Sequence, residues 1–261
     1  MAKIVVMTGH KHRLVSQVLL KLFLLDGHEL DSVIIENRRK TIKQVINRFA
    51  LKGLNYSIYI FLKTALHFFF GKYFMEDLFP LDSAIKYTKI NQYNVVDHNS
   101  DKCIDILNRI SPDIIVFAGC RLIRSEVFSI ANIACINIHG HDIEKVRGSG
   151  YPGFWENIND DDEFGITIHM VTEELDQGDI LYRKLYPLQV TNLKTIDSVF
   201  YEEAPVCLVN GIKNLLDYIH TVITSIFRWS HFQNGFVNRF LRSSDSSFRS
   251  IWTCSRTSTC I

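Results

Sequence analysis

Short apolar strands separated by helical stretches constrain the fold of this chain more than any other feature. Ile4 to Met7 predicts a buried strand, and after a polar turn comes an amphipathic helix that ends near Asp26-Gly27. Further apolar runs occur at Leu30 to Ile35, Ile114 to Gly119 and Ala134 to Ile138. Uninterrupted strands of this kind predict an α/β fold, with a mostly parallel Rossmann-like sheet and helices on both faces.

Three polar or glycine-containing segments stand at the ends of these predicted strands. They are Thr8-Gly9-His10, Gly119-Cys120-Arg121 and Asn137-Ile138-His139. Because ligands on parallel sheets bind beyond the carboxyl ends of the strands, we expect the three segments to share one functional rim.

Composition narrows the classes of protein. The 261 residues carry a net charge of +1, with 22% charged and 47% hydrophobic residues, which indicates an ordinary globular chain and disfavours nucleic acid as the partner. The six cysteines show neither a CxxC pair nor a Cys/His ladder at zinc spacing, and the apolar run at the N-terminus is too short for a signal peptide. We therefore predict no metal site and a cytoplasmic location.

The stretch from Arg38 to Phe79 opens with three basic residues and is rich in aromatic residues. Its longest apolar portion, Leu54 to Phe70, falls short of the roughly 20 residues that a membrane-spanning helix needs. We expect a helical insertion, over about residues 38–90, that packs on the sheet or on a second subunit of a homodimer. The alternative is that residues 38–79 bind a membrane surface as an amphipathic helix.

The C-terminal part predicts an edge strand over Asp179 to Tyr182 and a helical appendage over Thr191 to Phe227, with Pro205 limiting or kinking one segment. Arg242 to Ile261 lacks any hydrophobic period. We therefore expect a catalytic domain at 1–190, a helical region at 191–241 and a disordered tail at 242–261. The alternative for the tail is the remnant of a truncated or frame-altered region.

Candidate chemistry lies between Cys135 and Tyr182. Asn137 and His139 alternate on one strand end, so both side chains point to the same side, and a glycine-rich loop follows at Arg147 to Gly153. Asp176 lies in a turn that contains Gly178. An amide, an imidazole and a carboxylate together suit the addition of an amine to a carbonyl carbon. No Ser or Cys occupies a recognisable nucleophile elbow, so a covalent acyl-enzyme is not indicated.

Four segments in order resemble the signature of formyltransferases that use N10-formyltetrahydrofolate. The segments are Asn137-Ile138-His139, Arg147-Gly148, Gly165 to Met170 and Leu175 to Leu181. That family includes the glycinamide ribonucleotide, methionyl-tRNA and amino-sugar enzymes. The resemblance is close over Pro112 to Tyr182 and looser over Met1 to Ile35.

The resemblance implies a role for each matching position. Asn137 would hold the formyl oxygen, His139 would move the proton of the amine and Asp176 would pair with His139. The segment Cys120-Arg121-Leu122-Ile123 is similar to the one that lines the pterin pocket. If the substrate is an amino-sugar nucleotide, we expect Arg147 and Gly148 to bind it by approaching a phosphate or the sugar; the alternative for Arg147 is a surface salt bridge. We expect a structural role for His169. The sequence departs from the family at Gly140 to Glu144, where many members have a Ser-Leu-Leu-Pro run.

Substrate choice follows by comparison within the family. The near-neutral charge and the lack of strand periodicity in the last 80 or so residues disfavour tRNA, and the aromatic insertion is foreign to the glycinamide ribonucleotide enzymes. The formyltetrahydrofolate hydrolases of the family carry an extra domain ahead of the catalytic one. We do not expect that domain here, because the first predicted strand begins at Ile4. We expect N-formylation of a nucleotide-linked amino sugar. The alternatives are methionyl-tRNA or glycinamide ribonucleotide formylation, and a non-catalytic or membrane-surface relative.

Overall fold

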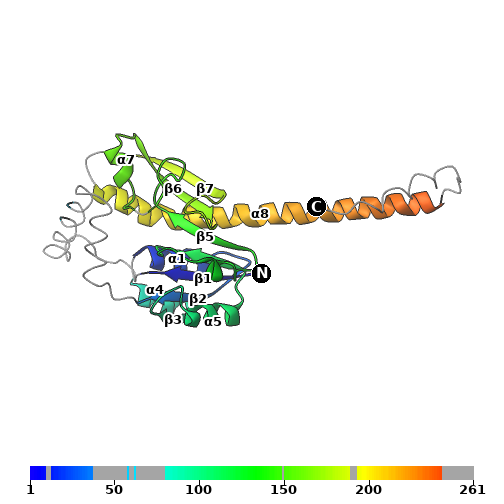
Figure 1. The fold of residues 1–261 in the computed structure, drawn as a ribbon, viewed down its shortest axis with the longest axis horizontal. Coiled ribbons are helices and arrows are strands. Elements are labelled where there is room, and N and C mark those ends of the chain that lie inside the picture. The colour runs from blue at the N-terminus through cyan, green and yellow to red at the C-terminus, as the bar shows by residue number, and fades with distance from the viewer. Residues whose placement is uncertain are drawn as a thin grey trace. The chain divides into compact units, whose positions relative to one another are not determined.

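The computed structural model describes residues 1–9, 13–37, 58, 62, 80–148, 150–188 and 193–242. The chain divides into two compact units, residues 1–214 and 215–261. The first unit contains a seven-stranded sheet with the order β3-β2-β1-β4-β5-β6-β7 (Figure 1).

The sheet is parallel over five strands and antiparallel over two. The parallel strands are β1 (Ala2–Thr8), β2 (His28–Glu36), β3 (Asn91–Val95), β4 (Ile114–Phe117) and β5 (Ala134–His139). Strand β6 (Glu163–Met170) pairs antiparallel with β5, and β7 (Ile180–Pro187) pairs antiparallel with β6 and forms one edge of the sheet, as predicted. The mostly parallel Rossmann-like sheet predicted from the apolar runs is therefore confirmed.

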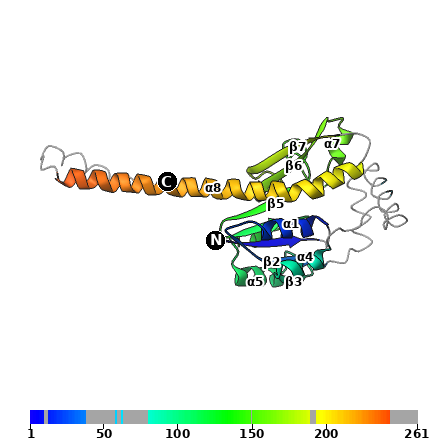
Figure 2. The same cartoon turned by 180° about the vertical axis from the view of Figure 1, so that it is seen from behind.

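Helices connect the strands and cover the sheet (Figure 2). They are α1 (Arg13–Phe23), α4 (Leu81–Thr88), α5 (Asp101–Ile110), α6 (Ser125–Phe128), α7 (Phe154–Ile158) and α8 (Leu193–Arg242). One core joins Val5 and Met7 of β1 to residues of α5 and α6, such as Leu107 and Val127. Successive strand residues face opposite sides of a sheet, so Ile4 and the other alternate residues of β1 face the side of the packed pair α1 and α4.

The rim on which we expect a ligand to bind lies where the sheet order reverses. β1 pairs with β2 on one side and with β4 on the other, which makes their carboxyl ends a switch point of the kind where α/β proteins bind ligands. The two turns that follow these strands touch closely, because a Cβ on Gly9 would lie 3.0 Å from the carbonyl oxygen of Gly119. The predicted proximity of these two segments is confirmed.

Helix α8 continues through Pro205, although the sequence predicted that this proline would limit or kink a helical segment. A proline inside a helix removes one backbone hydrogen bond and costs about 3 kcal/mol. Around Pro205 the helix buries a stripe of apolar residues at helical spacing: Ile196, Phe200, Ala204, Leu208 and Ile212. We infer that this burial offsets the lost bond, so the helix is not interrupted.

Most of the predicted insertion lies outside the described residues, as does the tail from residue 243 onward. Within the described part of the 38–90 stretch, α4 is the crossover helix between β2 and β3 and packs on α1. In the part of the chain that the structure describes, no helix is both long enough and apolar enough to cross a membrane.

Candidate functional site

Four polar side chains meet across β5, β6 and the turn that follows β6. Asn137 on β5 lies directly opposite His169 on β6, and the Nδ2 atom of Asn137 is 3.1 Å from the Nε2 atom of His169. The Oδ1 atom of Asp176 lies 3.9 Å from His139 Nδ1 and 3.7 Å from His169 Nε2. The structure thus brings together Asn137, His139 and Asp176, the three candidate residues named from the sequence, and adds His169 to them.

Hydrogen bonds determine which nitrogen of His169 carries the proton and how the amide of Asn137 is oriented. The Nδ1 atom of His169 is 2.9 Å from the carbonyl oxygen of Met170, so Nδ1 carries the proton and Nε2 accepts one N–H of Asn137. The amide of Asn137 keeps a second N–H, which is available to a ligand. His169 thus orients the candidate oxyanion-binding group, a role that needs the pairing of β5 with β6.

The turn that carries Asp176 is unusual in its backbone. Asp176 has a φ of 50°, in the left-handed region that non-glycine residues rarely adopt, and its side chain is 8% exposed. Its Oδ2 atom accepts a hydrogen bond of 2.7 Å from the backbone N–H of Gly148. One carboxylate therefore holds the glycine-rich loop with one oxygen and faces two imidazoles with the other.

Burial decides the charge of these imidazoles. It lowers the pKa of His139 to about 4, against the opposing effect of the Asp176 carboxylate, and it also lowers the pKa of His169. Both rings are therefore neutral at pH 7. His139 then has a lone pair with which to accept a proton.

These shifts predict that the folded state loses stability as the pH falls from about 6.5 toward 4. In that window the unfolded chain binds protons that a neutral, buried His139 does not, so acid favours unfolding. Thermal melts between pH 7.5 and about 4.5 should show a falling Tm, and a smaller fall in His139→Gln. His220→Gln, at an exposed position on α8, is the control and should melt like the wild type. A fall that is equally steep in His139→Gln would contradict this prediction.

A second carboxylate–imidazole pair lies beside the first. His141 Nδ1 is 2.8 and 3.0 Å from the two carboxylate oxygens of Glu156 on α7, and both side chains are fully buried. The ring centroids of His139 and His141 are 5.3 Å apart. The sequence analysis noted the departure at Gly140 to Glu144 but did not predict this pair, because nothing in the sequence indicates which way α7 turns Glu156.

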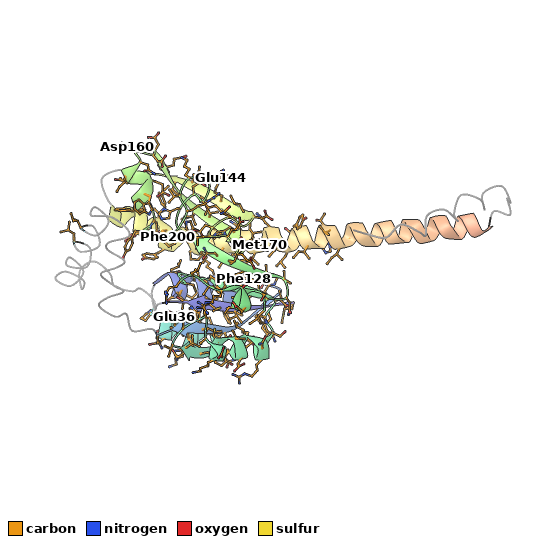
Figure 3. All side chains as sticks on the ribbon, in the orientation of Figure 1. Glu36, Phe128, Glu144, Asp160, Met170 and Phe200 are labelled. Atoms are coloured by element: carbon orange, nitrogen blue, oxygen red, sulfur yellow. The ribbon has the colours of Figure 1, made fainter. Side chains whose placement is uncertain are left out.

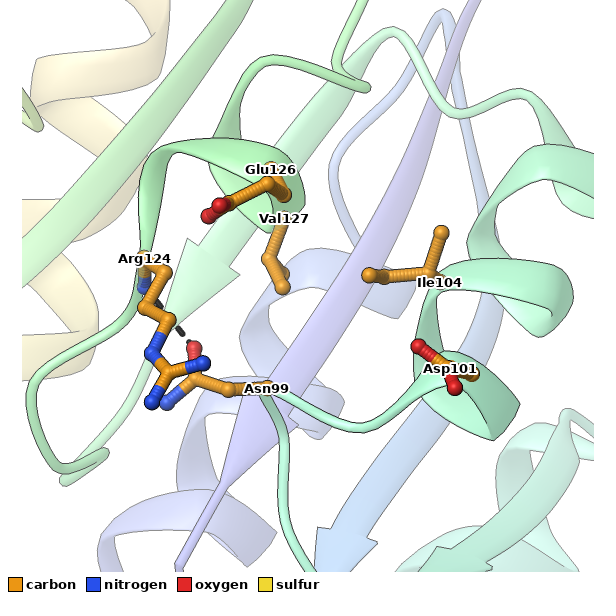
Figure 4. Close-up of a pocket in the computed structure, with 6 residues that line it drawn as sticks. All are labelled: Asn99, Asp101, Ile104, Arg124, Glu126 and Val127. Atoms are coloured by element: carbon orange, nitrogen blue, oxygen red, sulfur yellow. Dashed lines mark hydrogen bonds between the residues drawn. The ribbon is translucent and has the colours of Figure 1, made fainter.

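The candidate donor-binding segment, residues 120–123, presents two kinds of side chain. Cys120 and Ile123 pack on the core of β1, β4, α5 and α6, whereas Leu122 is 70% exposed. Asn99 fixes the backbone, because its amide donates to the carbonyl oxygen of Leu122 at 3.0 Å and accepts from the N–H of Arg124 at 2.8 Å. Figure 4 shows Asn99 and Arg124 on one side of the pocket that they line with Asp101, Ile104, Glu126 and Val127.

Arg121 belongs to an ion-pair group at the end of β2. Its Nη1 atom lies 3.6 Å from Oε1 of Glu36, a buried carboxylate labelled in Figure 3. The same carboxylate accepts the backbone N–H of His98 at 3.1 Å. Arg121 thus has a structural partner, and its largely exposed guanidinium remains open to solvent on the rim.

The two candidate substrate-binding residues differ in their contacts. Arg147 is exposed, and its Nε atom donates to the carbonyl oxygen of Ile143 at 3.3 Å. Gly148 has a φ of 85° and is the residue whose N–H binds Asp176. The structure therefore connects Gly148 to the cluster directly and places the Arg147 side chain at the surface.

The cluster also has a donor set that metal ions accept. His139, His169 and Asp176 each offer a ligand atom, and these atoms all lie within 4.8 Å of one another. Two imidazoles and a carboxylate suit zinc and related ions. The prediction of no metal site rested on cysteine spacing, and this set contains no cysteine.

The part of the chain that contains this cluster is similar to known proteins. Residues 81–201 match the family model described as "Formyl transferase". A methionyl-tRNA formyltransferase of Desulfotalea psychrophila is 37% identical over 87 residues, which are 33% of this chain and 27% of that protein. The matched part thus spans only about a quarter of that relative's length.

Two solved structures share the fold. One is a phosphoribosylglycinamide formyltransferase from Anaplasma phagocytophilum, with a TM-score of 0.57, 15% identity, and coverage of 81% of this chain and 85% of that one. The other is a formyltetrahydrofolate deformylase from Pseudomonas syringae pv. tomato, with a TM-score of 0.57, 16% identity, and coverage of 83% and 62%. At these identities the likeness concerns the fold. The family match covers α4 through the first turns of α8 and includes every residue of the cluster, so residues 81–201 are similar to a formyl transferase domain.

Proposed function

We propose that this protein transfers a formyl group from N10-formyltetrahydrofolate to a primary amine, without a covalent enzyme intermediate. The observation that carries the proposal is the meeting of Asn137, His139 and Asp176 at the carboxyl end of β5. These are the three positions at which the sequence resembles the catalytic residues of the family. The family match supports the same reaction.

The residues present fit a formyl donor. His139 Nε2 is a buried polar atom with no hydrogen-bond partner in the described part of the chain, so it is available to a reacting group. The segment 120–123 offers an exposed apolar side chain at Leu122, next to backbone groups that Asn99 holds in place. Bound there, the donor supplies the carbonyl carbon that the amine attacks.

Each residue of the cluster then has one task. The free N–H of Asn137 stabilises the negative charge that grows on the formyl oxygen during attack. Neutral His139 accepts a proton from the amine nitrogen and returns it to the leaving nitrogen. Asp176 faces the imidazole and stabilises the charge that His139 acquires.

For the amine we propose a nucleotide-linked amino sugar. Acidic residues at Asp160 to Glu163 and at Glu173-Glu174 flank the motif segments, and they disfavour a polyanion such as tRNA. The second candidate is methionyl-tRNA, which the name of one relative favours. We also propose that the protein is cytoplasmic and forms a homodimer. The alternative is that residues 38–79 bind a membrane surface.

A panel of amines tests both parts of the proposal. The protein is incubated with N10-formyltetrahydrofolate and, in separate reactions, a dTDP-linked 4-amino-4,6-dideoxy sugar, glycinamide ribonucleotide or methionyl-tRNA, and release of tetrahydrofolate is followed. We expect the amino sugar to give the highest kcat/KM. Turnover of methionyl-tRNA alone would overturn the amino-sugar assignment, and no turnover with any amine would overturn formyl transfer.

A further inference from the structure

The pairing of β5, β6 and β7 places three side chains in one row across the sheet. His139 on β5 lies directly opposite Thr167 on β6, and Thr167 lies directly opposite Arg183 on β7. Residues that lie directly opposite each other point to the same face of a sheet, so Thr167 and Arg183 share the face that carries the His139 imidazole. The row therefore runs from the proposed proton acceptor to the edge strand.

The segment that follows β5, residues 140–146, lies against this row. The hydroxyl of Thr167 donates a buried hydrogen bond of 2.8 Å to the carbonyl oxygen of His141. Gly165 precedes Thr167 by two residues and so belongs to the same face, and a Cβ there would lie 2.5 Å from the backbone nitrogen of Asp142. Strand β6 is thus the surface on which the segment packs, and the close approach needs glycine at position 165.

Arg183 joins this segment to the edge strand. Its Nη1 atom lies 3.2 Å from Oδ1 of Asp142 and also contacts the carboxylate of Glu144, which is labelled in Figure 3. Asp142 is buried, so water screens its attraction to the guanidinium less than it screens a surface pair. A buried carboxylate that loses its ion-pair partner is strongly disfavoured. Removal of the guanidinium should therefore displace Asp142 from its present position.

Hydrogen bonds connect Asp142 to the cluster. The carbonyl oxygen of Asp142 accepts the N–H of Val146 at 2.8 Å, which closes a turn. The imidazole of His139 has a hydrogen bond to the backbone of Val146. Gly148, two residues further on, donates its N–H to Asp176 at 2.7 Å. A displacement of Asp142 would therefore move the groups that hold both members of the His139–Asp176 pair.

We propose that Arg183 is a positioning residue for formyl transfer: it fixes Asp142 and, through the turn that Asp142 closes, the places of His139 and Asp176. This inference rests on the proposed function. The guanidinium acts on the reaction through the segment 140–146 and not by contact with the substrate. The two carboxylates that it binds belong to Gly140 to Glu144, where the sequence departs from the Ser-Leu-Leu-Pro run of many family members.

A purely stabilising ion pair gives a different expectation. The Arg183 side chain is 34% exposed, and ion pairs that solvent reaches contribute little to stability. Their loss should leave the turnover of the folded protein unchanged. The loss of a positioning residue instead changes the geometry of the reacting groups, so it lowers kcat in protein that is still folded. The KM for the donor should stay constant, because Asn99 holds the segment 120–123 independently of Arg183.

Arg183→Met and Arg183→Lys separate these roles. With the dTDP-linked 4-amino-4,6-dideoxy sugar we expect Arg183→Met to lower kcat about 10- to 10²-fold, as small displacements of catalytic groups do, with no change in the KM for N10-formyltetrahydrofolate. Both carboxylates contact the same nitrogen of Arg183, so the compact ammonium group of lysine can take its place. Arg183→Lys should therefore recover most of the lost turnover.

Lys184→Met is the matched control. Lys184 is the next residue of β7, faces the other side of the sheet and pairs with Glu203 of α8 at 3.0 Å. Its replacement also removes an ion pair and a positive charge from β7, but on the face away from the segment 140–146. It should keep the wild-type kcat. Thermal melts identify a temperature at which every variant is folded, and release of tetrahydrofolate is measured there.

Asp142→Ala tests the route through the segment. If Arg183 acts through Asp142, this variant should lower kcat as Arg183→Met does, and the double variant should lower it no further. Additive losses would overturn the positioning role, as would a wild-type kcat in folded Arg183→Met, an equal loss in Lys184→Met, or a change confined to the KM of the donor. Failure of the wild type with every amine of the panel would instead overturn the proposed function, and the positioning role with it.

Discussion

Replacement of His139 by alanine is expected to reduce formyl transfer by about 10² to 10⁴-fold while tetrahydrofolate still binds. The neutral imidazole is the group that the proposed mechanism uses to move the proton between the two nitrogens, and alanine offers no substitute. Donor binding should persist because residues 120–123 are held by Asn99 and by the core, which the substitution does not touch. Single-turnover release of tetrahydrofolate measures the first effect, and a binding titration measures the second.

The control for this loss is His28→Ala. His28 begins β2, so it lies at the amino end of a parallel strand, away from the rim that carries the cluster. It should turn over at the wild-type rate. Wild-type turnover in His139→Ala would contradict the assigned role, and loss of both turnover and folate binding would indicate a structural one.

The fold was predictable wherever burial on both faces leaves an uninterrupted apolar run. β1 and β4 consist almost entirely of buried apolar residues, and their sequences show it. β3 reads Asn-Gln-Tyr-Asn-Val, and only Val95 is buried, so its position at the sheet edge gives no hydrophobic signal. The helix through Pro205 was not predictable either, because the local cost of proline is visible in the sequence and the compensating burial is not.

The site was predictable only in part. Asn137, His139 and Asp176 lie in segments whose order and spacing carry the resemblance, and the structure brings them together. The contact of His169 with Asn137 depends on the register between β5 and β6, since a shift of one residue would turn His169 to the other face. The pairing of His141 with Glu156 depends on the orientation of α7, a helix of five residues without a periodic pattern of its own.

In the Leu-Asp-Gln-Gly-Asp segment, Gly178 affects both the packing of the turn and the position of Asp176. A Cβ at this position would clash with the backbone carbonyl of Met170, so only glycine lets the turn lie against the end of β6. Asp176 stands two residues earlier and takes its left-handed conformation within that turn. The glycine of the Leu-Asp-Gln-Gly-Asp segment is therefore what places the carboxylate between the two imidazoles.

Gly178→Ala is accordingly expected to lower the free energy of unfolding by about 2 to 3 kcal/mol, because the backbone of β6 must shift to admit the methyl group. Formyl transfer by the folded variant should also fall about 10²-fold, as small displacements of catalytic groups typically cause.

Gly27→Ala is the matched control: Gly27 has a φ of 80° and open space around it, so alanine adds backbone strain of about 1 kcal/mol far from the cluster. Urea denaturation and tetrahydrofolate release measure the two quantities in both variants. Gly27→Ala should lose stability and keep its turnover, and wild-type turnover in folded Gly178→Ala would show that the turn does not set the position of Asp176.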